Sequence, residues 1–182
     1  MQFLKPFLTI LIVALACGLP AQAQSRCDGE TLPAEARLLL KKRLPGWRIK
    51  LPSDLEAYDK ELWAKEHPKE CPGMAVGHFE DASQVAYGLL LIPKSAAGAG
   101  YRIVVLAKSE AADGYSLRIL DHESGDDSGL VISRVPPGTY PGFDTTQSAR
   151  LKLDGLEAEW IEKSSVLYFW QNGKYRTLQT SD

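Results

Sequence analysis

The first 23 residues constrain this chain most, because they predict a segment that takes no part in the folded domain. Lys5 precedes an uninterrupted apolar run over residues 7–16, which is the length of a signal-peptide core and too short to span a bilayer. Residues 21–23 read Ala-Gln-Ala, a typical cleavage site, so we expect cleavage between Ala23 and Gln24. The sequence therefore predicts a signal peptide over 1–23 and a periplasmic or secreted domain over 24–182, with no transmembrane segment in the mature chain.

Cys17 leaves one alternative open for the fate of this segment. It follows Val13-Ala14-Leu15-Ala16, which loosely resembles a bacterial lipobox, in which the cysteine is lipidated and becomes the first residue. Ala14 occupies the position where a lipobox usually has leucine. Ordinary cleavage after Ala23 fits better, and a lipid anchor through Cys17 is the alternative.

Export also determines how the cysteines are interpreted. The chain has three cysteines, and removal of the signal peptide leaves Cys27 and Cys71. Two cysteines in an oxidising compartment predict one structural disulfide. A redox pair is the alternative, but the two residues lack the C-x-x-C spacing that lowers a thiol pKa.

The order of patterns along the mature chain predicts an α+β fold. Helix-forming residues cover 33–44 and 53–67, and the second segment begins with the capping-box spacing Ser53-Asp54-Leu55-Glu56. From Met74 onward the pattern changes to strands. We expect two N-terminal helices packed on a mostly antiparallel β-meander sheet in a single domain. The predicted strands cover 86–92, 101–107, 115–120, 130–135, 156–161, 166–170 and 174–178.

Two local patterns refine this expectation. Residues 86–92 and 101–107 are apolar at successive positions, which predicts central strands buried on both faces. Asp154-Gly155 and Asn172-Gly173 are each typical of two-residue hairpin turns. In the second helix, Leu55, Tyr58, Leu62 and Trp63 recur at the spacing of one face, which we expect to pack on the sheet.

A basic run, Lys41-Lys42-Arg43, lies in the last turn of the first predicted helix. Cations at a helix C-terminus complement the helix dipole, which is the ordinary explanation. A patch for an anionic partner is the alternative. Elsewhere the charges balance, with a net charge of −2 at pH 7, so binding of nucleic acid through bulk electrostatics is not expected.

Catalytic patterns are sparse. His67, His78 and His122 lie far apart and form no metal-binding spacing, and no nucleophile elbow or phosphate-binding glycine loop is present. A serine–histidine–carboxylate triad assembled only in three dimensions stays open. We therefore expect no cofactor and no catalytic residue that can be named, and we favour a protein that is not an enzyme.

The densest group of acids lies in residues 121–129, a predicted loop. Carboxylates alternating with glycine can bind Ca²⁺, although the spacing does not match an EF-hand. A solvated hairpin loop is the simpler interpretation. The metal candidates, which are weak, are Asp121, Glu123, Asp126 and Asp127.

Residues 71–81, CPGMAVGHFED, followed by YGLLL at 87–91, carry one resemblance. They resemble uncharacterised small exported bacterial proteins with a single degenerate FG-GAP-like segment, whose pattern is CPG-x-x-x-G-D-F-D-x-D-x-x-x-D-Y-x-LLL. The closing stretch 168–182 is similar to the end of such chains. The resemblance implies a calcium-binding loop, but His78 replaces the first Asp, and the Gly and later Asp before Tyr87 are missing. We therefore expect no calcium at this loop.

These observations favour an exported, non-enzymatic binding module. Export, one compact domain and the lack of catalytic spacing point to a protein partner, in a role like that of an inhibitor or immunity protein. A small envelope hydrolase with an unrecognised site is one alternative. A structural envelope component is another, which lipidation at Cys17 would favour.

Overall fold

The computed structural model describes residues 27, 29, 31–95, 100–110, 114–125, 127–144 and 146–182. The predicted signal peptide, its cleavage site at Ala23 and Gln24, Cys17 and Asp126 all lie outside the described residues. Within them, no helix combines the length and the apolar character needed to cross a membrane.

Strands account for most of the regular structure, so the fold is mostly β with two α-helices. The helical elements are α1 (Ala34–Arg43), the 3₁₀ turn η2 (Pro52–Asp54) and α2 (Ala57–Glu66). The strands are β1 (Trp47–Ile49), β2 (Met74–Gly77), β3 (Ala86–Pro93), β4 (Tyr101–Lys108), β5 (Tyr115–Glu123), β6 (Leu130–Val135), β7 (Gly138–Pro141), β8 (Ser148–Leu151), β9 (Gly155–Trp160), β10 (Ser164–Gln171) and β11 (Lys174–Ser181).

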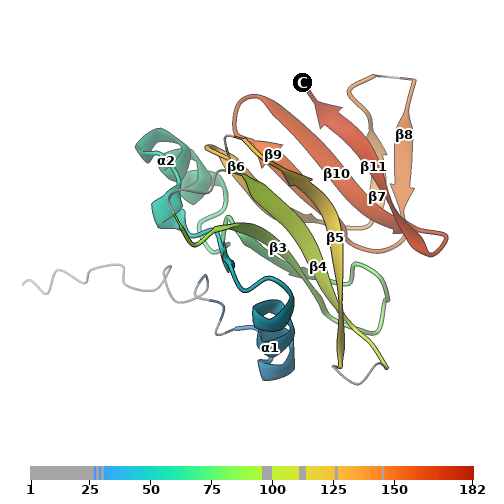
Figure 1. The fold of residues 1–182 in the computed structure, drawn as a ribbon. Coiled ribbons are helices and arrows are strands. Elements are labelled where there is room, and N and C mark those ends of the chain that lie inside the picture. The colour runs from blue at the N-terminus through green and yellow to red at the C-terminus, as the bar shows by residue number, and fades with distance from the viewer. Residues whose placement is uncertain are drawn as a thin grey trace, which may run out of the picture.

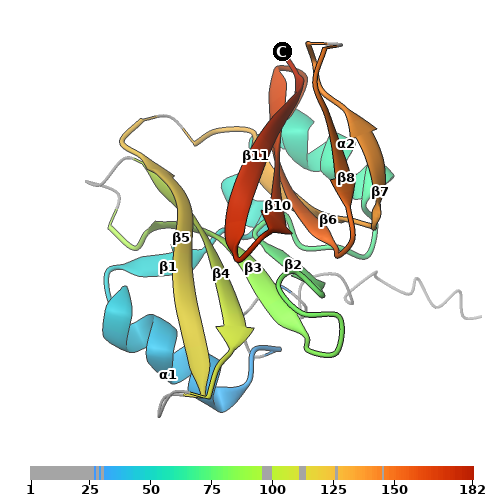
Figure 2. The same ribbon diagram turned by 90° about the vertical axis from the view of Figure 1, so that its right-hand side faces the viewer.

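The strands form two packed antiparallel sheets and a two-stranded ribbon, not the single meander predicted (Figure 1). The first sheet has the order β1-β3-β4-β5, with β2 also paired to β3. The second has the order β11-β10-β9-β6, and β7 pairs with β8 separately. In Figure 2 the layers follow one another as α1, the first sheet, the second sheet, and then α2 with the β7–β8 ribbon.

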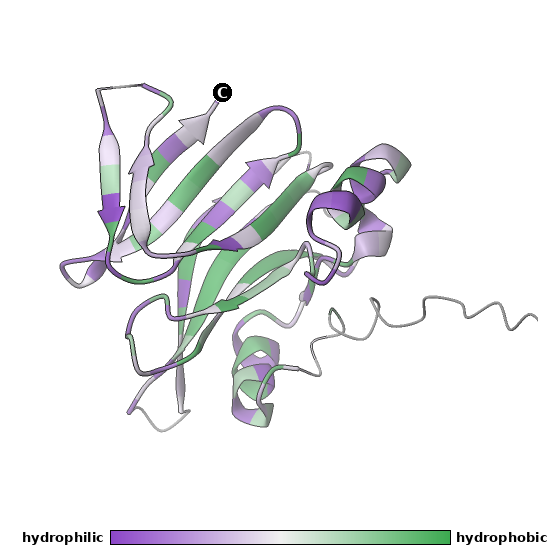
Figure 3. Ribbon diagram, turned by 180° about the vertical axis from the view of Figure 1, so that it is seen from behind, coloured by the Kyte–Doolittle hydropathy of each residue, from purple (hydrophilic) through white to green (hydrophobic). Residues whose placement is uncertain are grey.

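The central strands β3 and β4 of the first sheet are buried on both faces, as their apolar runs predicted. Leu89 and Leu91 face α1, whereas Leu90 faces the second sheet, and all three are fully buried. Figure 3 shows the corresponding hydrophobic colour along the central strands. Burial on both faces removes the polar–apolar alternation of a half-exposed strand.

The two helices cover different layers, which corrects the prediction that both pack on one sheet. Leu39 of α1 belongs to the core formed with the first sheet. Trp63 of α2 packs with Val131 of β6 on the outer face of the second sheet. Tyr58 was expected on this packed face but is 57% exposed. The capping box is also wrong, because η2 occupies Pro52–Asp54 and α2 begins after Glu56.

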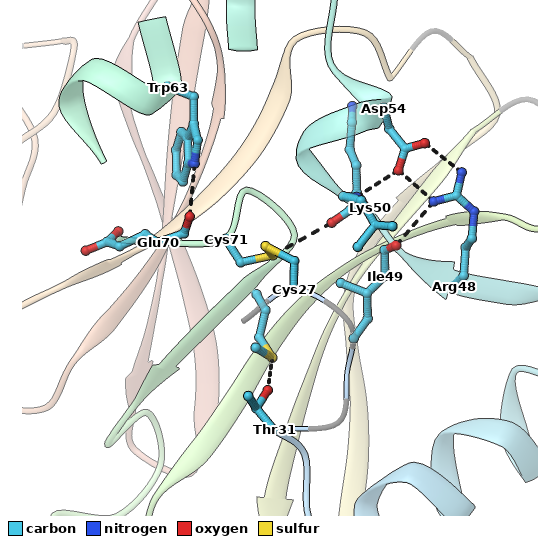
Figure 4. Close-up of a disulfide and its surroundings, with 11 residues drawn as sticks. Cys27, Thr31, Arg48, Ile49, Lys50, Asp54, Trp63, Glu70 and Cys71 are labelled. Carbon is cyan, nitrogen blue, oxygen red and sulfur yellow. Dashed lines mark hydrogen bonds and ion pairs between the residues drawn. A yellow bond between two sulfur atoms is a disulfide. The ribbon is translucent and has the colours of Figure 1, made fainter. Parts of the chain in front are cut away.

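The disulfide Cys27–Cys71 forms as predicted, at a junction in the first sheet (Figure 4). β1 and β2 lie end to end along the same edge of β3. At the junction the N–H of Lys50 donates to the carbonyl of Leu90, and the N–H of Leu90 donates to the carbonyl of Gly73. A Cβ at Gly73 would overlap the backbone of Lys50, so only glycine fits there.

The two predicted hairpin turns have different outcomes. Asn172-Gly173 is confirmed, because it joins β10 to β11 with both residues at positive φ. Asp154-Gly155 is not a hairpin turn. It is the corner at which the chain leaves β8 and enters β9 of the second sheet.

Candidate ligand-binding cavity

The structure brings none of the three histidines together. The ring of His67 stacks on Trp63 with ring centroids 4.1 Å apart, and its Nδ1 lies 3.1 Å from a carboxylate oxygen of Glu70. The Nδ1 of His78 lies 3.1 Å from the carbonyl oxygen of Gln84. His122 is exposed on β5. Each ring thus has a local environment of its own, and no shared site forms.

The buried carboxylate of Asp154 contacts the backbone of His78 and not its ring. Asp154 accepts the backbone N–H of His78 at 2.7 Å and pairs with Arg134 at 3.1 Å. Its own N–H donates to the carbonyl of His78. Asp154 therefore ties the corner before β9 to the end of β2, and it does not orient the His78 ring for catalysis.

The acids proposed as weak metal candidates are dispersed among different partners. Asp121 accepts the hydroxyls of Tyr101 at 3.1 Å and Tyr168 at 3.0 Å. Burial, followed by the charge of Asp121, raises the pKa of both tyrosines, so they remain protonated donors at neutral pH. Asp127 forms an ion pair with Lys50. Glu123 is exposed on β5, and its carboxylate accepts a longer hydrogen bond, 3.4 Å, from the hydroxyl of Tyr101.

Among the described residues, no group of three or more histidine, cysteine, aspartate or glutamate side chains is placed to hold a metal ion. In the FG-GAP-like segment, Glu80 pairs with Arg118 at 3.0 Å. Asp81 accepts the hydroxyl and the N–H of Ser83, and these hydrogen bonds lower its pKa. Both acids that this segment retains are thus engaged in internal contacts.

A cavity of about 470 Å³ lies between α1 and β1. Ligand-binding pockets in proteins typically have volumes of about 300–1,000 Å³. The cavity is lined by residues of three segments: α1 with its C-terminal end, β1 with its flanks, and the chain around the disulfide. They are Cys27, Gly29, Leu32, Arg37, Leu40, Lys41, Leu44, Trp47, Arg48, Ile49, Leu51 and Lys94.

The walls of this cavity are apolar. Leu40 comes from the last turns of α1, and Leu44 is the residue that caps the C-terminus of this helix. Ile49 and Leu51 come from β1 and the residues after it. Leu32, which is 2% exposed, lies on the segment that follows the disulfide. The arrangement offers an apolar surface that a ligand could bury.

Cations surround this apolar surface, and they differ in how they are held. Arg48 donates two hydrogen bonds to Asp54, at 2.6 and 2.7 Å, as Figure 4 shows, and this contact lowers the pKa of Asp54. Lys94 donates to the carbonyl of Pro45 at 2.8 Å. Within the described part of the chain, the structure gives no hydrogen bond or ion pair to the exposed side chains of Arg37 and Lys41.

One sequence signal pointed toward this cavity. The basic run at 41–43 left an anionic partner open, and Lys41 of that run lines the cavity. Trp47 also lines it, and the guanidinium of Arg102 lies 4.6 Å from the centre of its ring. The apolar walls could not be identified from the sequence, because leucines facing a cavity and leucines facing a core have the same pattern.

In comparisons with known proteins, no family model, no curated protein and no solved structure matches this chain.

Proposed function

We propose that this protein is an exported, non-enzymatic binding module, and that its ligand occupies the cavity between α1 and β1. The observation that carries the proposal is the composition of this cavity. Its walls are apolar, its lining also includes the cations Arg37, Lys41, Arg48 and Lys94, and its described lining holds no histidine, serine or carboxylate. Such a lining can bind and orient a ligand but lacks a nucleophile with an adjacent base.

The export part of the proposal rests on two features. One is the sequence pattern of residues 1–23, which predicts a signal peptide, and the other is the Cys27–Cys71 disulfide. Disulfides persist in oxidising compartments such as the periplasm, where they stabilise small domains.

A protein partner is the second candidate, with a role like that of an inhibitor or immunity protein. One observation favours it: Leu38 of α1 is 67% exposed and lies beside the basic residues of this helix. An exposed apolar side chain among cations suits a partner with an acidic surface around an apolar contact.

Native mass spectrometry of the mature chain, recovered from a bacterial periplasm without denaturation, tests the cavity. Leu40→Trp fills the cavity, whereas Leu38→Trp places the same side chain on the exposed side of α1. We expect a bound species in the wild type and in Leu38→Trp, and its loss in Leu40→Trp.

An empty wild-type chain, with a melting temperature unaffected by envelope lipid and peptide extracts, would contradict the proposal. A bound protein that Leu38→Trp removes and Leu40→Trp retains would favour the second candidate. Conversion of the ligand during incubation would favour the small hydrolase considered from the sequence.

A further inference from the structure

We infer that the ligand of the α1–β1 cavity is a single-chain amphiphilic anion, an acyl carboxylate whose tail enters the cavity and whose carboxylate lies at Arg37 and Lys41. This inference rests on the proposed function and specifies the chemistry of its ligand. Apolar side chains and exposed cations line the same cavity. The apolar side chains suit the hydrocarbon tail of such a molecule, and the cations suit its carboxylate.

The tail follows from the walls of the cavity. Leu40, Trp47 and Leu51 line the cavity and are only partly buried, so they keep apolar surface that a ligand can cover. Filling this space with a hydrocarbon chain removes apolar surface of both the protein and the ligand from water. Binding should therefore strengthen as the chain lengthens, until the cavity is full.

The carboxylate follows from the position of Arg37 and Lys41. They are four residues apart on α1, and side chains with this spacing lie on the same side of a helix. Both line the cavity, as do Leu40 and Leu44. Arginine and lysine form charge-assisted hydrogen bonds with carboxylates, so an anion can bind at these two residues while its tail is buried.

The other two cations of the lining are already held by the protein. Arg48 is paired with Asp54, and Lys94 donates to a backbone carbonyl. The headgroup site is therefore on the helix side of the cavity. Two acids, Asp28 and Glu30, adjoin Cys27 and Gly29 in the sequence and lie outside the described residues, so the experiment includes them.

Isothermal titration of the mature chain with dodecanoate, below its micelle concentration, tests this inference. We expect saturable binding with one ligand per chain and a micromolar dissociation constant. Dodecanol lacks the charge, dodecylammonium reverses it and acetate lacks the tail, so each should bind at least about tenfold more weakly than dodecanoate.

Variants locate the two ends of the ligand. Arg37→Gln/Lys41→Gln should weaken dodecanoate binding about tenfold or more and leave dodecanol unaffected. Leu40→Trp should weaken both. Lys65→Gln removes an exposed cation from α2 and should change neither. Asp28→Asn/Glu30→Gln should leave dodecanoate binding intact or tighten it. Circular dichroism of each variant checks that it is folded.

Equal binding of dodecanoate and dodecanol, or binding that survives Arg37→Gln/Lys41→Gln, would overturn the assignment of the carboxylate. Binding only to anionic phospholipid vesicles, or only to an acidic peptide, would overturn the single-chain ligand. In those cases a species retained in native mass spectrometry and lost in Leu40→Trp would still support the proposed function. Failure of both experiments would reject the two together.

Discussion

Lys50 and Asp127 form an ion pair in which the ammonium is almost completely enclosed. The side chain of Lys50 is 1% exposed, that of Asp127 is 28% exposed, and Nζ lies 3.3 Å from the carboxylate. Nζ also donates to the backbone carbonyl of Asp127. The pair joins the end of β1 to the loop before β6, so part of the acidic cluster predicted as a solvated or metal-binding loop serves the fold.

Replacing Asp127 alone should lower the free energy of unfolding more than replacing both members of the ion pair. Asp127→Asn removes a carboxylate that pairs with a buried ammonium, and we expect a loss of about 3 kcal/mol in the free energy of unfolding. Lys50→Met combined with Asp127→Asn should recover much of this loss. Urea denaturation measures both, with the exposed Glu61→Gln as control. A double variant no more stable than Asp127→Asn would contradict this account.

The disulfide should account for a large part of the stability of the domain. It links residues separated by 44 positions, and the chain-entropy model assigns a loop of this length about 4 kcal/mol. We expect Cys27→Ser/Cys71→Ser to lower the free energy of unfolding by about this amount. A reductant should destabilise the wild type and leave the double variant unchanged. Equal midpoints for the oxidised wild type and the variant in guanidinium would argue against this prediction.

The Arg48–Asp54 pair should make stability depend on pH. The hydrogen bonds from Arg48 lower the pKa of Asp54 below its ordinary value of 3.8 in the folded protein. A lowered folded-state pKa adds stability above the unfolded-state value, and this stability is lost as the pH falls through the folded-state pKa.

Asp54→Asn tests this dependence. It should cost about 1 kcal/mol at pH 7, and the difference from the wild type should shrink toward zero under strongly acidic conditions. Urea denaturation of the wild type and Asp54→Asn between neutral and strongly acidic pH measures this dependence. A difference in the free energy of unfolding that stays constant with pH would exclude titration of Asp54 as its cause.

Gly88 should tolerate no side chain, because β3 approaches β9 closely at this point. A Cβ at Gly88 would lie 2.5 Å from Cδ1 of Leu156. We expect Gly88→Ala to cost about 2 kcal/mol through overpacking, and Leu156→Ala in the same chain to reduce that cost. Gly46→Ala is the matched control, since a Cβ there meets nothing within 4 Å. Equal melting temperatures for the two alanine variants would refute the close approach.

Local patterns predicted both α-helices and seven strands, but not the short strands β1, β2, β7 and β8. The helix expected over 33–44 is α1, and the strand expected over 130–135 is β6 with the same bounds. Apolar runs at successive positions identified β3 and β4 as central strands. The local sequence patterns failed where contacts with a distant segment determine the local backbone structure. Asp154-Gly155 has the composition of a hairpin turn, but Arg134 and the backbone of His78 hold Asp154 at a corner between strands.

The candidate site could be predicted only in part. The basic run at 41–43 left an anionic partner open, since clustered charge can be recognised without structure, and Lys41 of that run lines the cavity. Binding of an anion there stays a prediction. The resemblance to FG-GAP-like segments stays a prediction. In the structure, Glu80 and Asp81 of that segment contact Arg118 and Ser83.

The sequence by itself supported the export prediction, the pairing of Cys27 with Cys71 and the approximate positions of both α-helices and seven strands, because each depends on residues close in the chain or on a single possible pair. Only the tertiary structure decided that α1 and α2 cover different sheets, that Lys50 is buried against Asp127, and that a cavity lies between α1 and β1. These features arise from contacts between distant segments. A periodic pattern shows that a face will be buried, but it does not identify what will cover it.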